Sequence, residues 1–184
     1  MLDRNLRGAR DLVVRSLAEI RLAQGVLHRE HFLISALVEE LVPTAMMVAS
    51  GHGIMLTVLS VEEGVTIEAD RQILAAVIVN LLQNAFKFTR PGTTVTLRVR
   101  ASPERVLLEV EDACGGLPSG DVNDLFRPFE QRGVNRTGLG LGLAFCRWGA
   151  EANQGRIYAR TLPEVGCVFT VDLPRVPVPA IALR

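Results

Sequence analysis

The sequence predicts an α+β fold: a two-layer α/β sandwich in which helices cover one face of a mixed, mostly antiparallel sheet. Residues 93–101 and 106–111 alternate apolar and polar side chains on either side of a short turn, which is typical of paired, half-buried strands. Residues 156–161 and 165–173 repeat this arrangement and predict a closing hairpin. Apolar residues at helical spacing supply the second layer, at residues 36–49, 70–88 and 141–153.

The composition suits one compact domain with a short appendage. The chain has 184 residues, of which 48% are hydrophobic, so it can bury a real core. Twenty basic residues balance twenty acidic ones, and this zero net charge gives no case for a nucleic-acid partner or a membrane surface. No apolar run approaches the roughly 20 residues that span a bilayer, and the first residues do not resemble a secretory signal. We therefore expect no membrane contact by this chain.

The cysteines bear on the expected location. Cys114, Cys146 and Cys167 are odd in number and far apart in the sequence. Their spacing matches neither a zinc site nor a disulfide framework. A reducing cytoplasm is the simplest expected location, and a longer parent protein anchored in a membrane is compatible with it.

The two ends of the chain differ in pattern. Residues 3–24 predict a helix whose apolar stripe has nothing local to cover it. Two interpretations stay open: packing against another copy of the chain, and docking on the chain's own domain. The proline-containing tail, residues 175–184, has no partner pattern and is expected to be a linker or a free end.

Shorter elements precede the centre of the chain. Strands are expected at residues 31–35, 54–61 and 65–68, the last two joined by a turn at 62–64. Ser35 is the expected N-cap of the helix over residues 36–49. Pro43 interrupts that helix, so we expect a kink or a later helix start there.

The helix over residues 70–88 carries a narrow polar stripe on an otherwise apolar surface. Asp70 is its expected N-cap. Asn80, Asn84 and Lys87 follow at i, i+4 and i+7, on one face of the helix. The stripe alone is compatible with a solvated helix edge. Three further motifs downstream favour a functional role instead.

Those motifs come in a fixed order: Asp112-Ala113-Cys114-Gly115-Gly116, then Leu125-Phe126-Arg127-Pro128-Phe129, then Gly138-Leu139-Gly140-Leu141-Gly142. With the stretch from Asn80 to Thr89, they resemble the N box, first glycine box, F box and second glycine box of the sensor histidine kinase ATP-binding domain. That domain belongs to the Bergerat-fold (GHKL) ATPase superfamily. The resemblance extends over residues 29–174 and implies the Bergerat fold there. It implies that residues 1–28 are the C-terminal helix of the dimerisation and phosphoacceptor region.

The resemblance implies roles for the polar stripe. Asn84 is the Mg²⁺ ligand, and its carbonyl oxygen suits a hard cation that prefers oxygen. Asn80, one turn earlier, supports the phosphates or a metal-bound water. Lys87 neutralises phosphate charge, although a surface lysine that extends into solvent explains the same residue. ATP and Mg²⁺ are therefore the expected ligands.

The first glycine box is expected to bind the adenine ring. Asp112 would accept a hydrogen bond from the exocyclic amine, which guanine replaces with a carbonyl oxygen; the alternative is a turn-forming aspartate. Gly115 and Gly116 would let the backbone approach the ring. Cys114 stands where the family's Asp-x-Gly-x-Gly pattern has its first glycine. This departure bears on the local turn and on nucleotide affinity.

The F box and the second glycine box are expected on the phosphate side of the nucleotide. Phe126 and Phe129 would anchor a mobile lid or pack into the core, and the two roles are compatible. Residues 130–137 have the polar composition of that lid, and Thr137 is the expected cap of the next helix. Backbone N–H groups at the start of this helix would bind the phosphates, at Gly138, Leu139, Gly140, Leu141 and Gly142.

The expected chemistry is phosphoryl transfer. Hydrolases of the superfamily place a glutamate where this chain has Asn80, and an amide cannot take a proton from water at neutral pH. The resemblance therefore implies a protein-histidine kinase that binds Mg-ATP and presents the γ-phosphate to a histidine. His28, His31 and His52 do not lie in the family's phosphoacceptor pattern. No catalytic residue is assigned in this chain, and the acceptor is expected outside it.

The expected partners follow from the same resemblance. They are a phosphoacceptor histidine domain, in the same parent chain or another protein, a response regulator receiver domain, and a second copy of the chain packed through the N-terminal helix. Two alternative functions stay open: an anti-sigma-type Ser kinase, and a degenerate, non-ATP-binding phosphotransfer adaptor. The stimulus, the sensor domain and the response regulator are not specified by the sequence.

Overall fold

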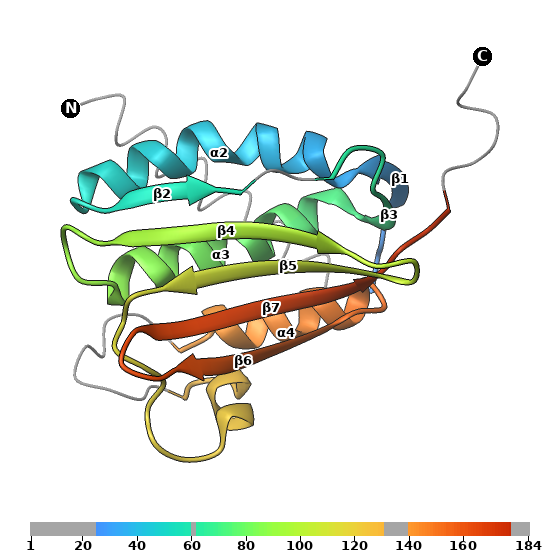
Figure 1. The fold of residues 1–184 in the computed structure, drawn as a ribbon. Coiled ribbons are helices and arrows are strands. Elements are labelled where there is room, and N and C mark those ends of the chain that lie inside the picture. Colours follow the sequence, from blue (N-terminus) through green and yellow to red (C-terminus); the bar gives the residue numbers. More distant parts are fainter. Residues whose placement is uncertain (1–24, 60–61, 131–139, 178–184) are drawn as a thin grey trace, which may run out of the picture.

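A computed structural model of the chain describes residues 25–59, 62–130 and 140–177 (Figure 1). The expected N-terminal helix, most of the expected lid and the end of the tail lie outside these residues. A five-stranded sheet forms one layer of the described part. In spatial order its strands are β2 (Met55–Val58), β4 (Thr94–Ala101), β5 (Arg105–Asp112), β7 (Gly166–Pro174) and β6 (Arg156–Leu162).

This sheet is mixed and mostly antiparallel, as the sequence predicts. β2 pairs in parallel with β4, and the other three pairings are antiparallel. In the β4–β5 hairpin, Ser102 Oγ accepts a hydrogen bond from the backbone N–H of Arg105 at 3.1 Å. β7 lies between β5 and β6, so Asp112 at the end of β5 is opposite Cys167 near the start of β7. This register decides which residues meet at that end of the sheet.

A second, two-stranded sheet pairs β1 (Arg29–Leu33) with β3 (Thr66–Asp70) in antiparallel fashion. The expected turn at residues 62–64 therefore joins β2 and β3, which belong to different sheets. β2 and β3 follow one another in the sequence but do not pair with each other: β2 pairs with β4, and β3 pairs with β1. A turn signal specifies a local reversal of the chain, whereas the strand partner depends on packing with distant segments.

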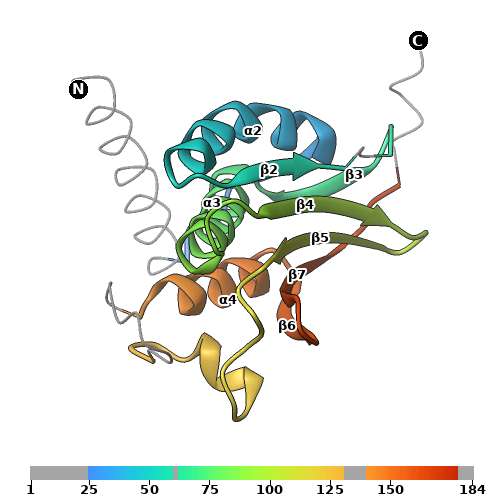
Figure 2. The ribbon, with the colours of Figure 1, turned by 60° about the vertical axis from the view of Figure 1, so that its left-hand side comes forward.

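Three helices cover one face of the large sheet: α2 (Ile34–Gly51), α3 (Arg71–Phe88) and α4 (Gly142–Ala152) (Figures 1 and 2). α3 is the central one, and its apolar side chains are almost completely buried: Ile73, Leu74, Val77, Ile78 and Leu81 are at most 1% exposed. Burying each such side chain contributes about 1.5–3 kcal/mol. The two-layer α+β architecture is confirmed.

The start of α2 differs from the prediction. The helix begins at Ile34, its N-cap residue is Leu33, and no side chain caps it, so Ser35 as the N-cap is wrong. The backbone N–H of Ile34 instead donates to the carbonyl of Val65 at 3.0 Å, which satisfies one of the amides that a helix start leaves open. Pro43 lies inside the helix, which continues to Gly51.

Among the described residues, α2 alone is long and apolar enough to cross a membrane by length and composition. Its mean hydropathy is 1.3, and 28% of the segment is buried. A core helix passes the same test, and α2 contributes five residues to the core: Ile34, Leu37, Val38, Ala45 and Ala49. This property of α2 is weak evidence for a membrane span.

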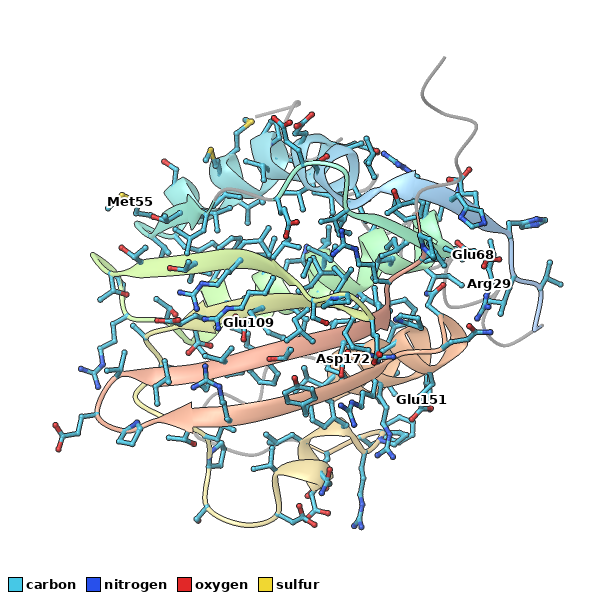
Figure 3. All side chains as sticks on the ribbon, turned by 45° about the vertical axis from the view of Figure 1, so that its right-hand side comes forward. Arg29, Met55, Glu68, Glu109, Glu151 and Asp172 are labelled. Atoms are coloured by element: carbon cyan, nitrogen blue, oxygen red, sulfur yellow. The ribbon has the colours of Figure 1, made fainter. Side chains whose placement is uncertain are left out.

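The other face of the sheet carries ion pairs (Figure 3). Asp172 on β7 is 2% exposed and accepts hydrogen bonds from Arg105 Nε at 2.6 Å and Arg156 Nε at 2.8 Å. Glu109 on β5 lies 3.0 Å from Arg100 Nε. Because strand side chains alternate between faces, these charges lie opposite the helices, and the Asp172 pairs join β5, β7 and β6.

Candidate nucleotide-binding site

The motif residues gather at one end of the molecule. α3 ends, β5 ends and α4 begins at the same end of the sandwich, on the left of Figure 1. At the other end, Asn153 Oδ1 just after α4 accepts a hydrogen bond from the backbone N–H of Asp70 just before α3 (2.7 Å). The end of the N-box helix and the start of the helix after the second glycine box therefore lie at the same end of the molecule.

α3 begins where the sequence predicts. Both backbone N–H groups of Gln72 and Ile73 donate to Asp70 Oδ1, each at 3.1 Å. The side chain thus satisfies two of the amides that a helix start leaves open. Asp70 as the N-cap is confirmed.

The polar stripe of α3 is not a solvated edge along its whole length. Asn80 is 5% exposed, and its Nδ2 donates to the carbonyl of Ala76 at 3.0 Å. Asn84 is half-buried, and its side-chain amide makes no hydrogen bond with the described residues. Lys87 is also half-buried, with Nζ 4.9 Å from the centre of the Phe88 ring. Of the two asparagines of the stripe, Asn84 is the more exposed, so its side chain is the more accessible to a ligand.

Asp112 is a buried carboxylate, 4% exposed, on the helix-covered face of β5 with Leu108 and Val110. Its Oδ1 accepts hydrogen bonds from the backbone N–H groups of Cys114 (3.1 Å) and Cys167 (3.3 Å). The bond from the Cys114 N–H, two residues after Asp112, closes an Asx turn. Asp112 is therefore a turn-forming aspartate. Oδ2 has one contact within the described residues, the Cys167 thiol at 3.3 Å.

Two cysteines meet beside this carboxylate. Cys114 Sγ lies 3.0 Å from Cys167 Sγ, and Cys167 Sγ lies 3.2 Å from Asp112 Oδ1. The hydrogen bond from the Cys167 thiol lowers the pKa of Cys114. The same bond, burial and the charge of Asp112 raise the pKa of Cys167 far above its ordinary value. Sequence spacing did not reveal this cluster, because only the pairing of β5 with β7 brings the thiols together.

The glycines of the first box form a tight turn. Gly115 and Gly116 have φ values of +89° and +117°, a region that side chains rarely adopt. A Cβ on Gly115 would lie 3.2 Å from an Arg90 guanidinium nitrogen, and one on Gly116 would lie 3.2 Å from Thr161 Cγ2. Arg90 is therefore a charged neighbour of this turn that motif matching did not identify.

Thr89 connects the N box to the first glycine box. It is the residue after α3, it is 6% exposed, and its Oγ1 accepts a hydrogen bond from the backbone N–H of Ala113 at 3.2 Å. Ala113 follows Asp112 directly. The end of the Asn84 helix is thus tied to the turn that carries the buried carboxylate, a link that sequence reasoning missed.

The two phenylalanines of the F box differ. Phe126 ends the short helix η1 (Val122–Phe126), is 3% exposed and meets Phe169 edge-on, with ring centres 6.3 Å apart. Phe129 is 74% exposed with φ of +65°. Its backbone N–H donates to the carbonyl of Gly140 at 3.0 Å. Core packing therefore holds for Phe126, whereas Phe129 connects the F box to the second glycine box through its backbone.

The second glycine box leads into α4. Thr137, Gly138 and Leu139 lie outside the described residues, and Gly140, Leu141 and Gly142 are described. α4 starts at Gly142, its N-cap residue is Leu141, and neither a capping side chain nor an acidic residue occupies its first turn. No acidic side chain in the first turn of α4 therefore neutralises the positive end of its helix dipole, which suits an anion.

The chain matches a known family. Residues 69–177 match the family described as "Histidine kinase-, DNA gyrase B-, and HSP90-like ATPase". This match covers 109 of the 184 residues (69 to 177 inclusive).

Its relatives include sensor histidine kinases and sensor proteins. The sensor protein KdpD of Mycobacterium tuberculosis is 35% identical over 171 residues, which is 88% of this chain and 19% of KdpD. KinB, the alginate biosynthesis sensor protein of Pseudomonas aeruginosa, is 37% identical over 108 residues, 59% of this chain and 18% of KinB. TorS of Escherichia coli is 40% identical over 105 residues, 57% of this chain and 11% of TorS. The chain spans less than a fifth of each of these relatives.

Solved structures share the fold. The catalytic domain of histidine kinase ThkA superimposes with a TM-score of 0.73 at 23% identity, covering 82% of this chain and 99% of that domain. Full-length ShkA in complex with AMPPNP superimposes with a TM-score of 0.75 at 24% identity, covering 96% of this chain and 39% of ShkA. The chain therefore belongs to the histidine kinase-, DNA gyrase B- and HSP90-like ATPase family, and it has the fold of a histidine kinase catalytic domain.

Proposed function

We propose that this chain is the ATP-binding catalytic domain of a two-component sensor histidine kinase. In this proposal it binds Mg-ATP and presents the γ-phosphate to a histidine outside the chain. The observation that carries the proposal is the buried Asp112 carboxylate. Two backbone N–H groups hold it at the end of a central strand, on the helix-covered face of the sheet and next to a glycine turn.

Adenine selectivity would come from Asp112 Oδ2. That oxygen receives only the weak thiol donor of Cys167 within the described residues. The exocyclic amine of adenine is a stronger donor, so adenine gains a good hydrogen bond there. Guanine presents a carbonyl oxygen at the same place, which a carboxylate repels. The turn at Gly115 and Gly116 has no side chains to keep the ring away.

The phosphates would lie between α3 and the start of α4. Asn84 fits a Mg²⁺ ligand, because its side-chain oxygen is half-buried and uncommitted among the described residues. When bound, Mg²⁺ would neutralise phosphate charge and polarise the transferred group. Lys87 supplies a positive charge one turn later. In the proposal, backbone N–H groups of residues 138–142 bind the phosphates; of these, Gly140 to Gly142 are described and lead into the positive end of α4.

Transfer to a protein is favoured over hydrolysis by Asn80. Its amide donates to Ala76 inside the helix and cannot accept a proton from water at neutral pH. The chain would therefore contribute nucleotide binding and positioning, and the acceptor would supply the nucleophile. Asn80 would support the phosphates or a metal-bound water.

The acceptor and other partners belong to the proposal. His28 precedes β1, His31 lies within it, and His52 follows α2; all three are exposed, and none lies within a helix. We place the acceptor histidine outside this chain, with a response regulator receiver domain downstream. Residues 29–174 would be the catalytic domain, residues 1–28 the end of a dimerisation helix that pairs two copies, and residues 175–184 a tail. A cytoplasmic location is part of the proposal.

Calorimetry of nucleotide binding tests this function. The 184-residue chain is titrated with ATP and GTP, with and without Mg²⁺, and Asp112→Ala is compared. We expect Mg²⁺-dependent ATP binding, GTP binding weaker on the order of a hundredfold, and loss of ATP binding in Asp112→Ala. Asp121→Ala is the matched control, because Asp121 is an exposed aspartate that caps η1. Absence of binding by either nucleotide would reject the proposal and favour the adaptor.

A further inference from the structure

Two thiols lie beside the proposed adenine site without a role in it. Cys114 Sγ and Cys167 Sγ are 3.0 Å apart, although the residues are 53 positions apart in the sequence. Cys114 belongs to the turn after β5, and Cys167 belongs to β7. The Cys167 sulfur also contacts both carboxylate oxygens of Asp112, at 3.2 and 3.3 Å. The three residues form one cluster.

We propose that Cys114 and Cys167 are a reversible disulfide site, and that its oxidation reshapes the first glycine box and weakens nucleotide binding. Formation of the disulfide rests on the geometry of the two sulfurs. Its effect on nucleotide rests on the proposed function.

The separation of the sulfurs favours a disulfide over a bound metal. Disulfide sulfurs are about 2.05 Å apart, so the pair closes by a movement of about 1 Å. Cys114 precedes Gly115 and Gly116, and a glycine turn accommodates such a movement easily. The donor atoms of Asp112, Cys114 and Cys167 all lie within 4.8 Å of one another. However, two sulfurs on one tetrahedral zinc at about 2.3 Å would be about 3.8 Å apart, so a metal would have to separate them.

The two thiols differ in exposure and reactivity. Cys114 is half-buried, so a small oxidant reaches it, whereas Cys167 is 2% exposed. The hydrogen bond from Cys167 lowers the pKa of Cys114, which favours its reactive thiolate. Cys114 is therefore the thiol that reacts with the oxidant first, and Cys167 is the one that resolves the intermediate.

The chemistry balances with a peroxide as oxidant. The Cys114 thiolate attacks one oxygen of hydrogen peroxide, the O–O bond breaks, and Cys114 becomes a sulfenic acid with release of hydroxide. The Cys167 sulfur then attacks the Cys114 sulfur, the S–O bond breaks, and the second oxygen leaves as water with the Cys167 proton. Each sulfur loses one electron, and the two oxygens of the peroxide gain them. A dithiol such as dithiothreitol reverses the bond by exchange.

Oxidation removes hydrogen bonds from the site. The single Cys167 thiol proton, which Asp112 and Cys114 Sγ share in the reduced chain, is lost, and so is the contact from Cys114 Sγ to the carbonyl of Gly116 at 3.6 Å. The new bond also pulls the glycine turn toward β7, away from its reduced position beside Asp112. We expect ATP to bind about tenfold more weakly to the oxidised chain, which corresponds to about 1.4 kcal/mol.

Thermodynamic linkage makes this expectation reciprocal. If oxidation weakens ATP binding tenfold, saturating Mg-ATP favours the dithiol over the disulfide by the same factor. For a two-electron couple, this raises the reduction potential of the pair by about 30 mV. The potential is measured with and without Mg-ATP in dithiothreitol redox buffers.

Mass spectrometry tests the disulfide independently of nucleotide. The reduced 184-residue chain is treated with hydrogen peroxide, denatured, alkylated and digested. We expect loss of two hydrogen atoms, a peptide pair joining Cys114 to Cys167, and one alkylated thiol in place of the three in the reduced chain. Dithiothreitol restores all three. Cys146→Ala is the matched control and keeps the linked pair, because Cys146 lies elsewhere, in contact with Val77.

Calorimetry tests the consequence of oxidation. ATP affinity is measured for the reduced and the peroxide-treated forms of the chain, Cys146→Ala, Cys114→Ser and Cys167→Ser. We expect the tenfold loss, reversed by dithiothreitol, in the first two proteins. The two serine variants should show the same affinity before and after peroxide, whatever that affinity is.

Three results would overturn the inference. The first is peroxide treatment that leaves Cys114 and Cys167 unlinked, for example with Cys114 oxidised to a sulfinic acid. The second is a purified chain that holds one equivalent of metal protecting both thiols. The third is a disulfide that forms without changing ATP affinity or the reduction potential. If the reduced chain does not bind ATP, the proposed function fails, whereas the disulfide is still decided by mass.

Discussion

Thr89 Oγ1 accepts a hydrogen bond from the backbone N–H of Ala113 at 3.2 Å. This bond joins the residue after α3 to the residue after Asp112, across 24 positions of sequence. Both residues lie where the N box and the first glycine box meet. The hydrogen bond therefore couples the helix that carries Asn84 to the turn that carries the buried carboxylate.

We predict that Thr89→Val weakens ATP binding with little change in fold. Valine keeps the shape of threonine but leaves the Ala113 N–H without its partner, a loss of about 1 kcal/mol. The turn after β5 is then held less firmly, so we expect a several-fold rise in the ATP dissociation constant, measured by calorimetry. Thr96→Val, on the open face of β4 opposite Glu111, is the control and should leave ATP affinity unchanged. Equal effects of the two substitutions would contradict the coupling.

Gly140→Ala is expected to disturb the contact between the second glycine box and the F box. A Cβ at Gly140 would lie 2.9 Å from the carbonyl carbon and 3.0 Å from the Cα of Phe129. Its φ of +69° also strains any side chain, by roughly 1–2 kcal/mol. We expect weaker ATP binding and a lower melting temperature.

Gly64→Ala separates the two causes. Gly64 has a similar φ of +74° but no atom within 4 Å of its Cβ position. The Gly64→Ala variant should be less stable because of backbone strain, while its ATP affinity stays unchanged. If both alanine variants lose ATP affinity equally, the clash with Phe129 is not the cause of the weaker ATP binding of Gly140→Ala.

On the open face of the sheet, removing the carboxylate of Asp172 should cost less stability than removing the two arginines that pair with it. Asp172 is almost completely buried, whereas the side chains of Arg105 and Arg156 are 37% and 73% exposed. Removing the carboxylate leaves two arginines that water can solvate, so Asp172→Ala should cost about 1–2 kcal/mol. Removing both arginines leaves a buried, uncompensated carboxylate, and the double variant should cost about 3–5 kcal/mol. Urea unfolding measures both, and the reverse order of costs would refute this account.

The reactivity of Cys114 should depend on pH in a way that reveals its neighbour. The hydrogen bond from Cys167 lowers the pKa of Cys114, so its thiolate persists at a lower pH than that of an ordinary cysteine. Alkylation by iodoacetamide, followed by mass spectrometry, should therefore reach half its maximal rate at a lower pH in the folded chain than in the unfolded chain.

Variants of Cys167 identify the cause of that shift. Cys167→Ala removes the donor, so the alkylation profile of Cys114 should move to higher pH. Cys167→Ser keeps a donor and should stay close to the original profile. Identical profiles for the alanine and serine variants would show that the hydrogen bond does not set the reactivity of Cys114.

The sequence alone was sufficient for features that depend on nearby residues. The strands and helices of the catalytic fold were predicted to within about two residues for the central part, such as α3, expected over residues 70–88 and found at Arg71–Phe88. Asp70 was recognised as its cap, because a cap acts on amides two and three positions away. The order of the four motifs indicated the family, which the match over residues 69–177 confirms.

Tertiary structure alone decided which distant residues meet. β2 pairs with β4 and β3 with β1, although β2 and β3 are neighbours in the sequence with a turn signal between them. Cys114 and Cys167 meet because β7 inserts beside β5 with Asp112 opposite Cys167, a register that the spacing of the cysteines does not contain. Periodicity and capping are local properties of the chain, whereas strand partners and register follow from the packing of the whole core.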